Sequence, residues 1–116
     1  MNDYKEKQIL ASDLFSSGGF LVTNKRLLTL FGPSKATFLS NLVNKFIYFK
    51  ENNMLNEDGS FITTFKDQSS QTGMNEYELR KCKKFAKGKG FLSTYMKGLP
   101  SKEHYILNID KIVNEI

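Results

Sequence analysis

The positively charged side chains of this chain are concentrated in one segment. Residues 80–102 contain eight Lys and Arg and no Asp or Glu, a net charge of +8. Residues 1–79 carry a net charge of −1 and residues 103–116 carry −2, so this segment supplies more than the whole formal charge of +5. A local excess of cations is typical of a surface that binds a polyanion. The alternative is a solvated lysine-rich helix, but such helices usually intersperse Glu with Lys.

The spacing of apolar residues places many of these cations on one face of a predicted helix. Apolar residues that recur every three or four positions predict the buried face of this helix, and they are Leu79, Cys82, Phe85 and Ala86. The opposite face then carries Glu76, Tyr77, Arg80, Lys81 and Lys84. Asn75 is a suitable N-cap, with Glu78 three residues later in a capping-box arrangement. The helix is predicted to begin near Glu76 and to end at the break 88–90, with Cys82 as a core residue.

A basic helix exposed in this way fits the major groove of DNA. Arg80 is one of two Arg against fifteen Lys. It is predicted to read sequence, because a guanidinium group can make a bidentate contact to guanine. Three residues near the start of the helix are predicted to contact neighbouring base edges or phosphates, namely Asn75, Glu76 and Tyr77. Phosphate neutralisation is predicted for the lysines of the same segment, Lys81, Lys83, Lys84 and Lys87.

The elements around this helix follow the order of a winged helix-turn-helix. A strand is predicted in residues 61–65, and a short polar helix in 66–71 is followed by a turn with Gly73 and a buried Met74. Two strands are predicted at 91–97 and 103–109, joined by a five-residue loop. Tyr95 and Tyr105 are predicted to pair across them. The hairpin tip should place Lys97 and Lys102 beside the DNA backbone or in the adjacent minor groove.

The first half of the chain predicts helices at 25–31 and 33–51, and Asp110 is expected to cap a last helix at 111–115. The helix at 33–51 has an apolar surface wider than one packed face requires. It is predicted either to be a central helix or to meet another subunit. In the second case the homodimer interface would include Phe38, Phe46 and Phe49.

Several ordered motifs together resemble a known family. They are a helix ending in residues 49–53, an acidic turn at 57–59, a turn and helix start at 72–77, and a hairpin tip at 97–102. This set resembles the winged-helix domains of phage and plasmid replication proteins, including DnaD-like replisome organisers, and of related phage regulators. The resemblance covers about residues 20–109. It implies binding of double-stranded DNA in replication initiation or transcriptional regulation, with replication or transcription proteins as partners.

The predicted fold class is therefore α+β, a winged helix-turn-helix with a two-stranded wing. Residues 1–19 are expected to form a lead segment, with a short helix or strand at 8–15. The winged-helix domain is expected to occupy 20–116, with the helix-turn-helix at about 66–88 and the wing at about 91–109. A cytoplasmic location in a prokaryotic or phage-infected cell is expected from the resemblance and from the single Cys, which excludes an internal disulfide.

Other classes of function find little support in the sequence. One His, one Cys and the lack of a nucleophile motif or phosphate loop predict a protein that is not an enzyme, with no cofactor, metal or small-molecule substrate. No apolar run reaches the roughly 18 residues of a membrane span, and no signal peptide is evident. RNA binding lacks the expected exposed aromatic residues among the basic ones. The main alternative is a winged helix that mediates protein interaction or dimerisation without binding DNA.

Overall fold

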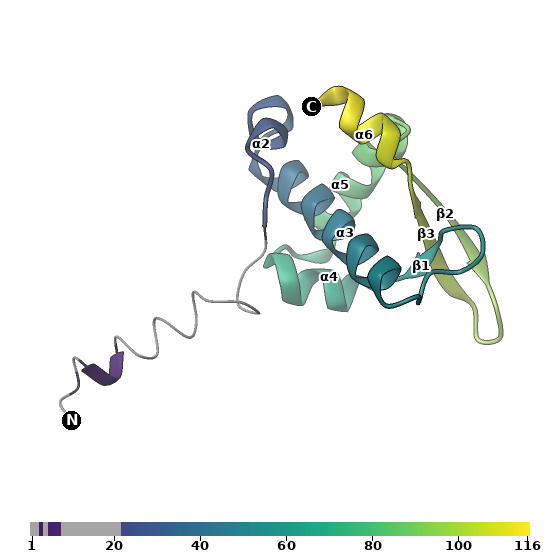
Figure 1. The fold of residues 1–116 in the computed structure, drawn as a ribbon, viewed down its shortest axis with the longest axis horizontal. Helices are drawn as coiled ribbons and strands as arrows, with labels where there is room; N and C mark the ends of the chain where they lie inside the picture. Colours follow the sequence, from purple (N-terminus) through teal and green to yellow (C-terminus); the bar gives the residue numbers. More distant parts are fainter. Residues whose placement is uncertain (1–2, 4, 8–21) are drawn as a thin grey trace.

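The computed structural model describes residues 3, 5–7 and 22–116. Most of the predicted lead segment, including the helix or strand expected at 8–15, lies outside the described residues. The helices are α2 (Lys25–Phe31), α3 (Pro33–Glu51), α4 (Phe65–Thr72), α5 (Glu76–Gly88) and α6 (Ile109–Glu115). The strands are β1 (Phe61–Ile62), β2 (Leu92–Lys97) and β3 (Lys102–Leu107), paired antiparallel in the order β1-β3-β2. The predicted α+β, winged-helix-like fold is confirmed, and Figure 1 shows the β2–β3 hairpin projecting from the helical body.

Helix α3 is the central helix of the fold. Pro33 begins it, and α2, α4, α5 and β3 all pack against it. Phe38 is only 1% exposed and belongs to the core, so the prediction that it forms a dimer interface is wrong. Phe46 and Phe49 are partly buried, and their ring centroids lie 6.5 and 5.7 Å from that of Phe61 in β1. The wide apolar surface of α3 is thus largely used within the same chain.

The turn between α4 and α5 is built as its sequence predicts. Gly73 ends α4 in the left-handed region, with φ of 76°, where a Cβ atom would be strained. Met74 follows it into the core. The hydroxyl of Thr72 accepts a hydrogen bond from the Met74 amide at 3.2 Å and donates one to the Gln68 carbonyl at 2.7 Å. This turn joins α4 directly to α5, and the two helices pack against each other.

The strand predicted at 61–65 is shorter than expected. Only Phe61 and Ile62 pair with β3, because Thr64 instead caps α4 and accepts a hydrogen bond from the Asp67 amide at 3.1 Å. The last helix also begins earlier than predicted. Asn108, rather than Asp110, is its N-cap and accepts a hydrogen bond from the Lys111 amide at 3.1 Å.

The register of the hairpin corrects the predicted Tyr95–Tyr105 pair. Tyr95 lies opposite His104, and Tyr105 lies opposite Thr94. Because neighbouring residues of a strand point to opposite faces, the two tyrosines are on different sides of the sheet. Tyr105 is buried against the helices, while Tyr95 stacks on His104 with ring centroids 4.9 Å apart. Lys102 lies in β3 rather than in the loop, directly opposite Lys97.

Candidate nucleic-acid interface

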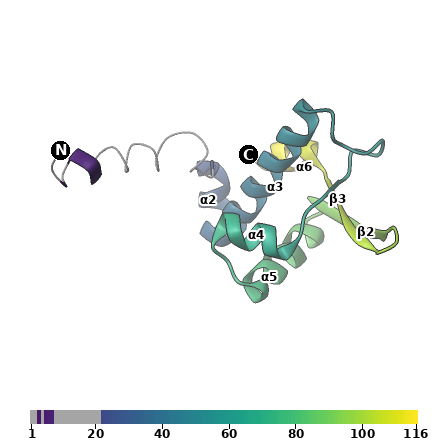
Figure 2. The same ribbon diagram turned by 90° about the horizontal axis from the view of Figure 1, so that it is seen from below.

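Helix α5 is anchored by its apolar face and exposes its basic one. Its buried side chains are Leu79, Cys82 and Ala86, with Phe85 partly buried beside them. Burial raises the pKa of the Cys82 thiol, which suits a core residue rather than a reactive one. The N-terminus is capped by Asn75, whose side-chain oxygen accepts a hydrogen bond from the Glu78 amide at 2.9 Å. Figure 2 shows α5 at the lower edge of the molecule and the β2–β3 hairpin projecting to the right of the helices.

The exposed face of α5 contains the predicted residues Glu76, Tyr77, Arg80, Lys81 and Lys84. Arg80 and Glu76 form an ion pair one turn apart, with Nη2 2.7 Å and Nε 3.2 Å from Oε1. Both side chains are more than half exposed, so this pair adds little stability and its partners can exchange for a ligand. The Lys81 ammonium lies 5.2 Å from the ring centroid of Tyr77, which is 68% exposed.

Lys83 differs from the other predicted phosphate ligands. Its Nζ lies 2.5 and 2.6 Å from the two carboxylate oxygens of Glu103 in β3. The side chains are only 15% and 27% exposed. The same ammonium lies over the rings of Phe65 and Tyr105, at 5.2 and 5.4 Å. The prediction of Lys83 as a phosphate ligand is therefore corrected, because its charge is used to join α5 to the wing.

The surroundings of the Lys83–Glu103 pair shift the pKa values of the Glu103 carboxyl and the Tyr105 hydroxyl. Burial alone would raise the pKa of Glu103, but the hydrogen bond and charge of Lys83 outweigh it and bring the pKa below its usual value. Burial raises the pKa of Tyr105 to about 12. Both groups therefore keep one protonation state near neutral pH: Glu103 is ionised and Tyr105 is neutral.

A hollow of about 510 Å³ lies between α5 and the start of α4. Its lining is one aromatic ring and four cationic side chains, namely Phe65, Arg80, Lys83, Lys84 and Lys87. Lys84 and Lys87 are exposed, and neither forms an ion pair with any residue that the structure describes. The guanidinium of Arg80 lies 5.5 Å from the Phe65 ring centroid. The charge of this lining favours an anionic ligand.

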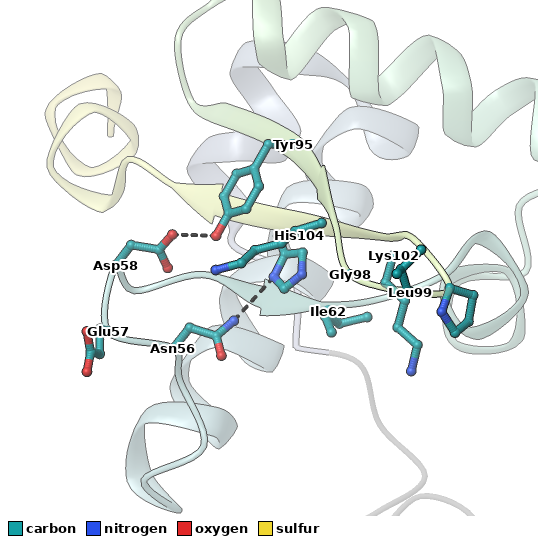
Figure 3. Close-up of a pocket in the computed structure, with 11 residues that line it drawn as sticks. Asn56, Glu57, Asp58, Ile62, Tyr95, Gly98, Leu99, Lys102 and His104 are labelled. Carbon is teal, nitrogen blue, oxygen red and sulfur yellow. Dashed lines mark hydrogen bonds between the residues drawn. The ribbon is translucent and has the colours of Figure 1, made fainter.

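The two lysines of the hairpin do not line the hollow beside α5. Lys97 and Lys102 share the sheet face that carries Tyr95 and His104, whereas Glu103 lies on the face turned toward α5. They line a groove of about 750 Å³ between the hairpin and the loop before β1, shown in Figure 3. The structure thus brings the lysines of α5 together but places the two wing lysines at a separate edge.

The groove also holds a polar cluster that sequence reasoning missed. The Tyr95 hydroxyl donates a hydrogen bond to the Asp58 carboxylate. The Ser60 backbone amide donates another to the same carboxylate at 2.9 Å. Asn56 lies 3.3 Å from Nδ1 of His104. Hydrogen bonds from Ser60 and Tyr95 lower the pKa of Asp58 to about 2. The acidic turn at 57–59 was the available signal, but only the fold brings it to the hairpin.

Comparison with known proteins yields one informative match. No model of a known protein family matches the sequence, and none of the curated proteins matches it either. Among solved structures, the chain is similar to one described as the N-terminal domain of a DNA binding protein. The TM-score is 0.61 at 15% sequence identity, and the match covers all of this chain and 95% of the other. At this identity the likeness establishes a shared fold.

Proposed function

We propose that this protein binds double-stranded DNA, with α5 in the major groove and the hairpin as a wing on the adjacent backbone. The observation that carries the proposal is the set of exposed cations that α5 places around the hollow, since the fourth lining cation, Lys83, is already paired with Glu103. The exposed cations of this set are Arg80, Lys84 and Lys87. Exposed lysines and arginines on one helix are the side chains that neutralise DNA phosphates.

The side chains divide into distinct roles. Arg80 is exposed and carries a planar guanidinium, so it is the residue proposed to read guanine after releasing Glu76. Tyr77 and Glu76 lie beside it near the start of α5. Tyr77 contacts a neighbouring base or phosphate, whereas the Glu76 carboxylate, which phosphates repel, contacts a base edge. Lys81, Lys84 and Lys87 neutralise phosphates. The side-chain oxygen of Asn75 is used as the helix cap, which leaves its amide nitrogen for DNA.

The proposed process and setting rest on two likenesses. The solved structure that shares this fold is described as part of a DNA binding protein, and the sequence motifs resemble winged-helix replication proteins and regulators. We therefore propose a role in replication initiation or transcriptional regulation in the cytoplasm of a prokaryotic or phage-infected cell, without catalysis. Among the described residues no helix is long and apolar enough to cross a membrane.

The test is the salt dependence of duplex binding. For the wild-type protein, the logarithm of the association constant should fall linearly with the logarithm of salt concentration, by about 0.9 per phosphate contact. The double variant Lys84→Ala/Lys87→Ala should reduce that slope by about two. Lys25→Ala is the control, because Lys25 is exposed on α2 and does not line the hollow. Binding independent of salt, or equal slopes for all three proteins, would contradict the proposal.

A second candidate is a protein-interaction or homodimer module. Its support is the exposed apolar pair Ile47 and Tyr48 on α3, which are 44% and 59% exposed. In a dimer this pair, with the partly buried Phe46 and Phe49, would meet a second copy. Sedimentation tests the homodimer, which would be removed by a mass that stays monomeric at high micromolar concentration. Salt separates the two candidates, because an interaction module would keep its binding largely unchanged as salt rises.

A further inference from the structure

The tip of the hairpin presents an apolar side chain to solvent. Leu99 is fully exposed, and Pro100 beside it is also exposed. An exposed leucine contributes nothing to the core, since it buries no apolar area on folding. Its position at the tip, beyond the last strand pair, makes it the part of the wing that reaches furthest along the hairpin.

The tip is held in a defined shape. Lys97 and Lys102 form the last cross-strand pair before the loop, so their side chains lie on one sheet face at the base of the tip. Gly98 adopts φ of 103°, and the Ser101 hydroxyl donates a hydrogen bond to the Gly98 carbonyl at 3.1 Å. The closed loop thus presents the apolar Leu99 side chain at the tip, with Lys97 and Lys102 at the last strand pair behind it. Figure 3 labels Leu99 and Lys102.

We propose that Leu99 inserts between base pairs from the minor groove and kinks the DNA, while Lys97 and Lys102 contact the phosphates on either side. This inference rests on the proposed function. The minor groove is bordered by phosphates on both walls, and apolar wedges such as Leu and Pro unstack base steps in proteins that bend DNA. The charge and shape of the tip complement both features.

The groove behind the tip limits how far the wing enters. It is lined by the carboxylates of Glu57 and Asp58 as well as by the lysines. Asp58 is held ionised by hydrogen bonds from Ser60 and Tyr95. These negative charges repel phosphates that approach beyond the lysines. The contact is therefore confined to the tip and does not spread over the open sheet face.

The Lys83–Glu103 ion pair gives the wedge its position. It joins α5 to β3 at Glu103, directly next to the Lys97–Lys102 pair at the base of the tip, so the ion pair holds this end of the hairpin against the helix. With α5 in the major groove, the tip is then presented to the neighbouring minor groove rather than swinging freely.

The experiment compares three variants on the same DNA. Leu99→Ser removes the wedge, Leu99→Met keeps an apolar wedge, and Leu30→Ser is the control because Leu30 is 46% exposed on α2. The DNA is a duplex of about 30 base pairs that contains TA steps, which unstack most easily. It carries 2-aminopurine at a TA step or, in a second set, fluorophores at both ends.

Wild-type protein, Leu99→Met and Leu30→Ser should raise 2-aminopurine fluorescence and shorten the end-to-end distance, as a kink of about 20–90° requires. Leu99→Ser should lose both signals and bind about tenfold more weakly. It should keep the wild-type salt slope, because it leaves Lys97 and Lys102 unchanged.

The possible failures are distinguishable. If Leu99→Ser binds and bends the duplex as wild type does, or if wild type binds without changing either signal, the wedge is refuted while DNA binding stands. If wild-type protein binds no duplex at low salt, the proposed function and the wedge both fail. If Leu99→Ser instead loses binding to anionic lipid vesicles and not to DNA, the tip is a membrane contact and the wedge is again refuted.

Discussion

The ammonium nitrogen of Lys83 lies 2.5 and 2.6 Å from the two carboxylate oxygens of Glu103, so that one ion pair joins helix α5 to strand β3. The two partners are twenty positions apart in the sequence. Both side chains are mostly buried, which strengthens the attraction and raises the cost of leaving either charge alone.

Lys83→Met should therefore destabilise the protein, because Glu103 keeps its charge in a partly buried site without a partner. The expected loss is about 1–3 kcal/mol in the free energy of unfolding, measured with urea. The double variant Lys83→Met/Glu103→Leu should recover much of this loss, because it removes both charges. Additive effects of the two single substitutions would show that the pair does not couple α5 to β3.

The lowered pKa of Glu103 predicts a loss of stability in acid. Because the native pKa is below the unfolded value of about 4.3, the unfolded chain binds the proton more readily. The contribution is complete above that value and is lost as the pH falls through the native pKa. Glu103→Gln should show a flatter dependence of unfolding free energy on pH below about 4.3. The comparison with wild type cancels the effect of Asp58, which both proteins contain.

Arg80 and Lys84 should affect DNA binding differently. Arg80→Ala should relax sequence preference and cost about 1–3 kcal/mol on the preferred site, because it removes a bidentate contact. Lys84→Ala should weaken binding to all duplexes and reduce the salt slope by about one. Selection of bound sequences from random duplexes at two salt concentrations measures both effects. Equal losses on every sequence for both variants would remove Arg80 as the residue that reads the bases.

Asn75 has a structural role that can be separated from DNA contact. Asn75→Ala removes the cap on the Glu78 amide and should lower the unfolding free energy by about 1 kcal/mol. Asn75→Ser retains an oxygen at the cap and should leave stability within a few tenths of a kcal/mol of wild type. Thermal unfolding measures the difference. If Asn75→Ser then binds DNA more weakly, the amide nitrogen contributes to the interface.

Phe38 should act on stability and not on association. Phe38→Ala opens a cavity beneath α3 and should cost about 3–5 kcal/mol of unfolding free energy. Ile47→Ala on the exposed side of the same helix should cost much less. Urea unfolding and sedimentation of both variants provide the check. A change of oligomeric state in Phe38→Ala with unchanged stability would contradict the buried position.

The sequence by itself determined the parts of this protein that depend on local interactions. The bounds of α3 were predictable because Pro33 favours a first helical position and apolar residues recur through residue 49. The start of α5 followed from Asn75, and the αL turn between the helices followed from Gly73. Each of these signals acts within about one helical turn, so neighbouring residues contain it completely.

Only the tertiary structure decided which distant side chains meet. The charge count along 80–102 could not show that Lys83 is neutralised by Glu103, nor that the lysines of α5 and of the wing lie at separate edges. Strand register placed Tyr95 on His104 instead of Tyr105, and packing around α3 placed Phe38 in the core. These outcomes depend on how elements far apart in the chain pack together, because burial and charge pairing are properties of the assembled surface and not of residue order.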